Sequence, residues 1–211
     1  MKTKRPYVLV VLLLILGVAY AQQDSNRKKV ILLDPGHGGI DSGTTAEDGT
    51  TKKDVVLDVA MNMVKLNQDI LDSKYEIYLT RVGDTLIDLE DRSRLVQYLR
   101  PDLFISLHCN HSPSPKTNGV EAYVHGNNKK VIGLAESIIH NLNQNLGLRY
   151  GSVKTGNFHV LRKGSEYCPS ILLELGYLSN LDESHYLEHQ GNRKALALAI
   201  LESFKRMKDS L

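Results

Sequence analysis

Short apolar segments alternate along this sequence with longer segments whose apolar residues recur at helical spacing. The segments with strand character are residues 30–33, 75–80, 103–107, 120–124, 158–161 and 170–175. Helical spacing is found over residues 54–71, 86–99, 129–146 and 192–207, with Gly147 expected to end the third helix. This alternation predicts an α/β fold, a single domain with a largely parallel or mixed sheet covered by helices on both faces.

The first 21 residues have the three-part pattern of a secretory signal peptide. A basic start that includes Lys2 and Lys4 precedes an apolar run over residues 7–18, and the small residues that follow predict cleavage after Ala21. A membrane anchor is the alternative, but the run is shorter than the ~20 residues that a spanning helix needs. We therefore expect an exported protein in which residues 22–29 are a flexible lead-in and residues 30–211 form the domain.

The charge balance and the cysteines narrow the class of protein further. The chain carries a formal net charge of +2, to which the basic start of the leader contributes, so the mature protein is near neutral. The sequence has no basic stripe of the kind that would indicate a nucleic-acid partner. Cys109 and Cys168 are the two cysteines, and in an oxidising compartment they form either a disulfide or two buried free thiols.

Two histidines and one glutamate stand where predicted strands end. His37 follows the strand at 30–33 in a glycine-rich turn, and His108 directly follows the strand at 103–107. Two imidazoles from neighbouring strand ends can hold one metal ion, and Glu174, at the end of the last strand, can then act as base for an activated water. The carboxyl edge of the sheet is also where sites of α/β proteins lie. The pattern indicates a zinc hydrolase.

Each of these residues also has a structural interpretation. His37 can be incidental to a tight turn, and that turn lacks the lysine and hydroxyl spacing of a phosphate-binding loop. Glu174 can pair with Arg81 or Arg92, whereas burial without a partner would raise its pKa and suit a general base. Asp34 can orient an imidazole or cap the turn. Three further histidines, His111, His125 and His159, have two open interpretations. One of them is an additional ligand or substrate contact, or they are ordinary surface residues.

Five segments resemble the zinc-dependent N-acetylmuramoyl-L-alanine amidases of the amidase_3 type. They are LDPGHGG at 33–39, KDVVL at 53–57, LTR at 79–81, DLFISLHCN at 102–110 and LELGYLSN at 173–180. The resemblance implies a twisted, mostly six-stranded sheet and cleavage of the amide between N-acetylmuramic acid and L-alanine in peptidoglycan. It also implies that His37 and His108 bind Zn²⁺ and that Glu174 is the catalytic glutamate.

One position departs from the family pattern. The family carries a third zinc ligand, a glutamate, where this chain has Lys52. An ammonium ~4 Å from the ion would cost roughly 4 kcal/mol per unit of metal charge at an effective dielectric constant of 20. Either Glu47 or Asp48 replaces the ligand, or two histidines and water hold zinc weakly, or metal and activity are lost and only peptidoglycan binding remains. We favour Glu47 as the third ligand.

The remaining expectations concern partners and location. Family members that need an activator carry a helical insertion, and the short connection from residue 124 to residue 129 leaves no room for one. We expect a monomer without an obligatory activator, in the periplasm or cell envelope, with peptidoglycan as its substrate. A non-catalytic peptidoglycan-binding relative and a zinc hydrolase of another amide are the alternatives.

Overall fold

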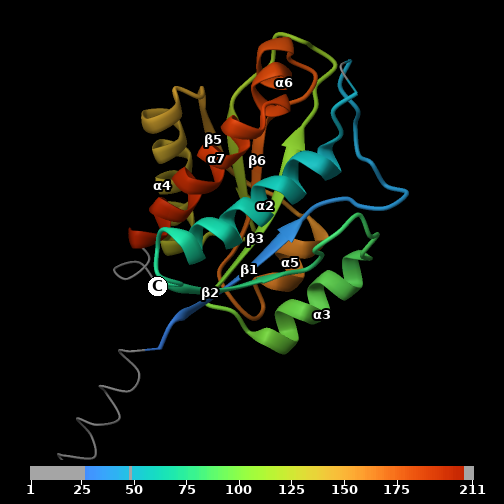
Figure 1. Ribbon diagram of the computed structural model, residues 1–211. Coiled ribbons are helices and arrows are strands. Elements are labelled where there is room, and N and C mark those ends of the chain that lie inside the picture. The colour runs from blue at the N-terminus through green and yellow to red at the C-terminus, as the bar shows by residue number, and fades with distance from the viewer. Residues whose placement is uncertain (1–26, 48, 207–211) are drawn as a thin grey trace, which may run out of the picture.

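The structure, a computed structural model, describes residues 27–47 and 49–206. The strands in this part are β1 (Lys29–Pro35), β2 (Tyr75–Leu79), β3 (Leu103–Asn110), β4 (Val120–Val124), β5 (Tyr150–Thr155) and β6 (Ser170–Tyr177). The helices are α2 (Lys52–Asp69), α3 (Leu89–Leu99), α4 (Lys129–Leu146), α5 (His159–Gly164), α6 (Leu181–Glu188) and α7 (Gln190–Ser203), followed by the 3-10 turn Phe204–Arg206. Figure 1 shows the sheet running through the molecule between two layers of helices.

The strands form one mixed sheet in the order β2-β1-β3-β6-β4-β5. The four strands β2, β1, β3 and β6 are parallel, and β4 runs antiparallel to β6 and parallel to β5. The carboxyl ends of β1, β3 and β6 therefore lie side by side at one edge of the sheet. The residues that follow the three strands therefore lie together at the carboxyl end of the parallel strands, where functional sites of α/β folds are expected.

The two faces of the sheet are covered unequally. On one face α2, α4 and α7 pack over the larger apolar core, which includes Leu33, Leu107 and Leu173. On the other face the shorter α3 and α5 cover a smaller core around Leu32 and Phe104. Side chains alternate between the faces along a strand, so every second residue of β3 and β6 faces the thinner layer.

The predicted fold class is confirmed, and so are most of the expected elements. One element was wrong: residues 158–161, expected to be a strand, enter helix α5. A short apolar run does not distinguish a buried strand from one buried helical turn, and here Val160 and Leu161 pack against the smaller core. Strand β5 was missed because none of its residues is buried and they show no apolar alternation.

Helix α6 was also missed, and its start depends on one side chain. Asn180 accepts a hydrogen bond from the backbone N–H of Glu183 at 3.1 Å, which caps the helix. The same side chain donates to the carbonyl of Pro115 at 2.8 Å. Asn180, the last residue of the last sequence motif, therefore both begins α6 and holds the loop after β3.

Several expectations concern the ends of the chain and the cysteines. The predicted signal peptide, residues 1–21, lies outside the described residues, whereas Arg27 and Lys29 contact Asp102. Within residues 27–47 and 49–206, no helix has the length and apolar content needed to cross a bilayer. Cys109 and Cys168 are buried free thiols, so the second of the two open alternatives for the cysteines is the observed one.

Asp102 ties the start of β1 to the segment before β3. Its carboxylate accepts hydrogen bonds from the N–H of Val30 at 2.8 Å and from the Lys29 ammonium at 3.0 Å. Burial alone would raise the pKa of Asp102, but these donors and Arg27 bring it below its ordinary value. Folding therefore favours the ionised form of this side chain.

We expect Asp102→Ala to lower the free energy of unfolding by about 1–2 kcal/mol at pH 7, because a backbone N–H loses its acceptor. The pKa of Asp102 in the folded protein lies below its unfolded value of ~3.9. Its contribution to stability is therefore complete above pH ~3.9 and is lost as the pH falls through the folded-state pKa. Urea unfolding followed by circular dichroism at pH 7 and pH 3 should show the difference between parent and variant shrinking at pH 3. An equal difference at both pH values would contradict this assignment.

Candidate active site

His37 lies in the loop that follows β1, in a left-handed backbone conformation with φ of 60°. Its Nδ1 atom lies 2.9 Å from a carboxylate oxygen of Asp41. This contact favours the tautomer with the proton on Nδ1 and leaves Nε2 free to bind a metal ion. Asp41, and not the Asp34 considered from the sequence, is thus the carboxylate that orients this imidazole.

Two buried arginines hold the loop that carries His37 by hydrogen bonds to its backbone carbonyls. Arg81 donates to the carbonyls of Pro35 and Gly36, at 3.0 and 2.9 Å. Arg92 donates to the carbonyls of Pro35 and His37, both at 2.9 Å. Both guanidinium groups are thus engaged by backbone oxygens, and neither pairs with Glu174 as the alternative interpretation required.

Asp34 supplies the buried negative charge that balances Arg92. Its carboxylate pairs with the Arg92 guanidinium and accepts hydrogen bonds of 2.7 Å from the hydroxyls of Thr80 and Ser106. The Asp34 and Arg92 side chains are 1% and 4% exposed. A carboxylate so deeply buried is stable only with such a full set of partners.

His108 is brought to His37 by the pairing of β1 with β3. The two imidazole rings lie 5.2 Å apart between centroids, edge to face. The His108 ring packs on the backbone of Gly36, where a Cβ atom would lie 2.4 Å from its Cε1, so only glycine leaves room for it. Burial lowers the pKa of His108 well below its ordinary value, which favours the neutral imidazole that metals bind.

Glu174 stands beside His108 on the next strand. The two residues are register partners in the parallel pair β3–β6, so their side chains share the face covered by α3 and α5. Its Oε2 atom is buried and has no hydrogen-bond partner among the described residues. Burial raises the pKa of Glu174 to about 7, the range that suits a general base at neutral pH.

A second carboxylate lies beyond Glu174. Glu121 of β4 is its register partner on the other side. Unlike Glu174, Glu121 is well paired: it accepts from the Lys154 ammonium at 2.6 Å and from the Tyr123 hydroxyl at 3.1 Å. The negative charge of Glu121 adds to the rise in the pKa of Glu174. Glu121 was not predicted as a site residue because nothing in its sequence segment distinguishes it from a surface residue.

Lys52 lies close to the two histidines, across Gly43 from His37. It is the first residue of α2, and the point where a Cβ on Gly43 would lie is 3.0 Å from both His37 Nε2 and Lys52 Cβ. The positive charge of Lys52 adds to the lowering of the pKa of His108 and offsets part of the rise in the pKa of Glu174. A cation of the chain itself therefore stands close to the predicted metal position.

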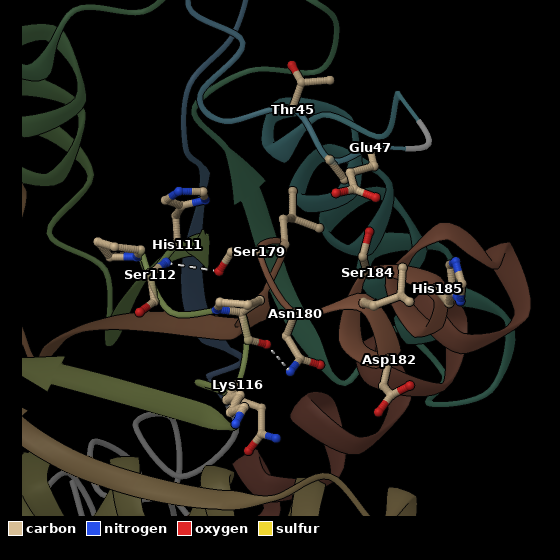
Figure 2. Close-up of a pocket in the computed structure, with 16 residues that line it drawn as sticks. Thr45, Glu47, His111, Ser112, Lys116, Ser179, Asn180, Asp182, Ser184 and His185 are labelled. Atoms are coloured by element: carbon tan, nitrogen blue, oxygen red, sulfur yellow. Dashed lines mark hydrogen bonds between the residues drawn. The ribbon is translucent and has the colours of Figure 1, made fainter.

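Glu47 is not brought to the histidines. It lines a separate hollow of about 1100 Å³ at the ends of β3 and β6 (Figure 2), whereas His37 and His108 line a hollow of about 280 Å³ beside α3 and α5. No three His, Cys, Asp or Glu side chains within residues 27–47 and 49–206 are grouped to hold a metal. Asp48, the other candidate ligand, lies outside the described residues.

The other histidines considered from the sequence separate in space. His159 lines the same hollow as His37 and His108, and His111 lines the larger one. His125 lies near the carbonyl of Gly156, 3.4 Å away. His185, which carried no signal in the sequence, also lines the larger hollow because the unpredicted helix α6 presents it there.

Comparison with known proteins identifies the family. Residues 31–206 match the model of the N-acetylmuramoyl-L-alanine amidases, and the chain belongs to this family, as the sequence motifs predicted. The fold agrees: the catalytic domain of CwlV, an N-acetylmuramoyl-L-alanine amidase from Bacillus (Paenibacillus) polymyxa, superposes with a TM-score of 0.76 at 31% identity. The match covers 87% of this chain and 99% of that one.

Two curated relatives are similar in sequence. The probable cell wall amidase LytH of Staphylococcus saprophyticus is 32% identical over 85% of this chain and 58% of its own length. The N-acetylmuramoyl-L-alanine amidase LytC of Bacillus subtilis is 33% identical over 82% of this chain and 34% of its own length. The chain thus spans less than two thirds of either relative.

We expect Arg92→Met to lower the free energy of unfolding by about 3–5 kcal/mol, because it leaves the buried carboxylate of Asp34 without its counter-charge. Arg94→Ala is the matched control on the same helix. Arg94 pairs with Asp91 at the surface, and its loss should change the free energy by no more than about 0.5 kcal/mol. Guanidinium unfolding curves measure both values, and equal effects would contradict the role given to Arg92.

Proposed function

We propose that this chain is an exported amidase that hydrolyses the amide between the lactyl group of N-acetylmuramic acid and L-alanine in peptidoglycan. The observation that carries the proposal is the row formed by His37, His108 and Glu174 at one edge of the sheet. Membership of the amidase family supports the choice of bond. A location in the cell envelope fits the similarity to LytH of Staphylococcus saprophyticus, a probable cell wall amidase.

The residues present fit part of a zinc site. His37 and His108 would hold the ion, since the first offers Nε2 and the second is kept neutral by burial. When bound, zinc supplies Lewis-acid activation of the scissile carbonyl and of water. Glu47 as third ligand stays a prediction, because it requires the loop before α2 to carry it from the larger hollow toward the histidines.

Glu174 is the proposed general base. Its unpartnered Oε2 atom can take the proton of the attacking water and then deliver it to the nitrogen of the leaving L-alanine. With a pKa of about 7, the group releases a proton almost as readily as it accepts one. Its burial beside His108 keeps bulk water from competing for the carboxylate.

We expect Glu174→Gln to reduce the release of stem peptides from purified sacculi at least 100-fold, because the amide of glutamine cannot carry the proton. Mass analysis of the soluble products measures this, since only an amidase frees stems that begin with L-alanine. Addition of a chelator to the parent should have the same effect. Continued release by the Glu174→Gln variant would remove Glu174 from the mechanism, and products with another end would indicate a different amide.

The metal affinity should be limited by Lys52. Because its ammonium repels a cation held by the two imidazoles, we expect Lys52→Glu to tighten zinc binding at least tenfold, measured by competition with a chromophoric chelator. Lys129→Glu makes the same change of charge at the start of α4 and should leave the affinity unchanged. The parallel variant Glu47→Ala loses affinity only if Glu47 is a ligand.

Equal zinc affinity in the parent and Lys52→Glu would show that Lys52 does not oppose the metal. A parent that binds sacculi without releasing stems, while Lys52→Glu releases them, would favour the alternative function. That alternative is a non-catalytic peptidoglycan-binding relative, and the position of Lys52 is the observation in its favour.

We also propose that the protein acts as a monomer without an obligatory activator. The connection of β4 to α4 has little bearing on this, contrary to the reasoning from sequence. Val124 pairs with Ile171 at the amino end of β6, so this connection lies at the edge of the sheet opposite to His108 and Glu174. The hollow that contains the two histidines is open at the other edge.

A further inference from the structure

Lys52 and Lys53 are adjacent at the start of α2, but only one of the two ammonium groups has a direct partner. Lys53 donates to Asp84 at 2.7 Å and to the carbonyl of Gly39 at 3.0 Å. The ammonium of Lys52 forms neither a hydrogen bond nor an ion pair within residues 27–47 and 49–206, although the residue is half-buried. A charge withdrawn from water is costly unless another charge balances it.

The backbone at Lys52 is held by the loop before α2, which fixes where the side chain starts. The N–H of Lys52 donates to the carbonyl of Thr44 at 3.3 Å. The space beside Gly43 lies between Lys52 Cβ and His37 Nε2, each of which is 3.0 Å from the point where a Cβ atom would lie. The Lys52 side chain therefore leaves its helix close to the nitrogen that His37 offers to a metal ion.

The charge of Lys52 acts on groups at the ends of β3 and β6. Of the charged groups that influence Glu174, Lys52 has the largest effect, and it offsets part of the rise in pKa that burial causes. Lys52 also adds to the lowering of the pKa of His108. The buried Oε2 atom of Glu174 has no hydrogen-bond partner among the described residues. An ammonium and a carboxylate oxygen, both without a direct partner, therefore attract each other across the site.

Most other charged side chains around the histidines are balanced by direct contacts. These contacts are Asp34–Arg92, His37–Asp41, Lys53–Asp84 and Glu121–Lys154. Arg81 is engaged by backbone carbonyls, and Asp88, on the wall of the smaller hollow, is exposed to water. Around the two histidines, in the part of the chain that the structure describes, Lys52 and Glu174 are then a cation and an anion that are withdrawn from water without a direct partner. Each is best balanced by the other.

We infer that Lys52 is the counter-charge of Glu174 when no metal is bound, and that a divalent cation binds the two histidines only by displacing this ammonium. The chain thus carries its own cation at a site that would otherwise take one from solution. The inference rests on the proposed function, because it concerns loading of the same site. It differs from simple repulsion: a fixed ammonium would oppose the ion whatever residue stands at position 174, whereas a displaced one gives up its attraction to Glu174.

A double-mutant cycle on the full chain in excess chelator tests the pairing. The four proteins are the parent, Lys52→Met, Glu174→Gln and the double variant, and urea unfolding gives the equilibrium constant of each. We expect the effect of Lys52→Met on this constant to differ at least fivefold between the two backgrounds, because the attraction exists only where residue 174 is glutamate. Lys129→Met removes an exposed ammonium at the start of α4 and is the matched control, which should show no coupling to Glu174→Gln.

The zinc affinities of the same four proteins, measured by competition with a chromophoric chelator, test the displacement. We expect Lys52→Met to bind zinc at least tenfold more tightly than the parent. The same substitution should change the affinity less than threefold in the Glu174→Gln background, because no attraction to residue 174 is then given up. A fixed ammonium would produce the same gain in both backgrounds.

Additive effects on unfolding would overturn the pairing, and equal gains in zinc affinity in the two backgrounds would overturn the displacement. Both outcomes are separate from the sacculus assay. Coupling in chelator with no zinc binding by any of the four proteins would support the counter-charge and contradict the zinc site of the proposed function. Release of stems by the parent without coupling would contradict the role of Lys52 alone.

Discussion

The buried ion pair between Asp34 and Arg92 is the interaction on which the site depends. It lies under the loop that carries His37, and the same guanidinium also holds two carbonyls of that loop. Breaking one side of such a pair leaves a charge in a medium that solvates it poorly. Together with Arg81, this support stabilises the loop with its left-handed turn at His37.

The site combines two carboxylates. Both oxygens of Asp34 accept from neighbouring donors, whereas Glu174 has few hydrogen-bond partners. Asp34 accepts from Thr80, Ser106 and Arg92, whereas Glu174 keeps a buried oxygen that has no hydrogen-bond partner in the described part of the chain, and its pKa is raised to about 7. Both carry buried oxygens toward the carboxyl ends of strands of one sheet, so burial alone does not separate their roles. The difference is the supply of hydrogen-bond donors, which suits Asp34 to hold structure and Glu174 to exchange protons.

Much of this arrangement could be predicted from the sequence because it follows from local patterns. The strands that carry His37, His108 and Glu174 are apolar runs of ordinary length, and parallel pairing places their ends together. The role of Asp41 was not predictable, because a loop residue four positions from His37 gives no periodic signal. The edge strand β5 was missed because its residues show no apolar alternation. The helix α5 was misread because one buried helical turn has the same short apolar run as a buried strand.

The contact between the His108 ring and the backbone of Gly36 has a consequence for the two histidines as a pair. A ring on one strand takes its position from the main chain of the loop that carries the other ring. The two imidazoles are thus mechanically linked, and displacement of that loop would release both together. The position of one imidazole and the order of the loop that carries the other therefore change together, as one structural variable.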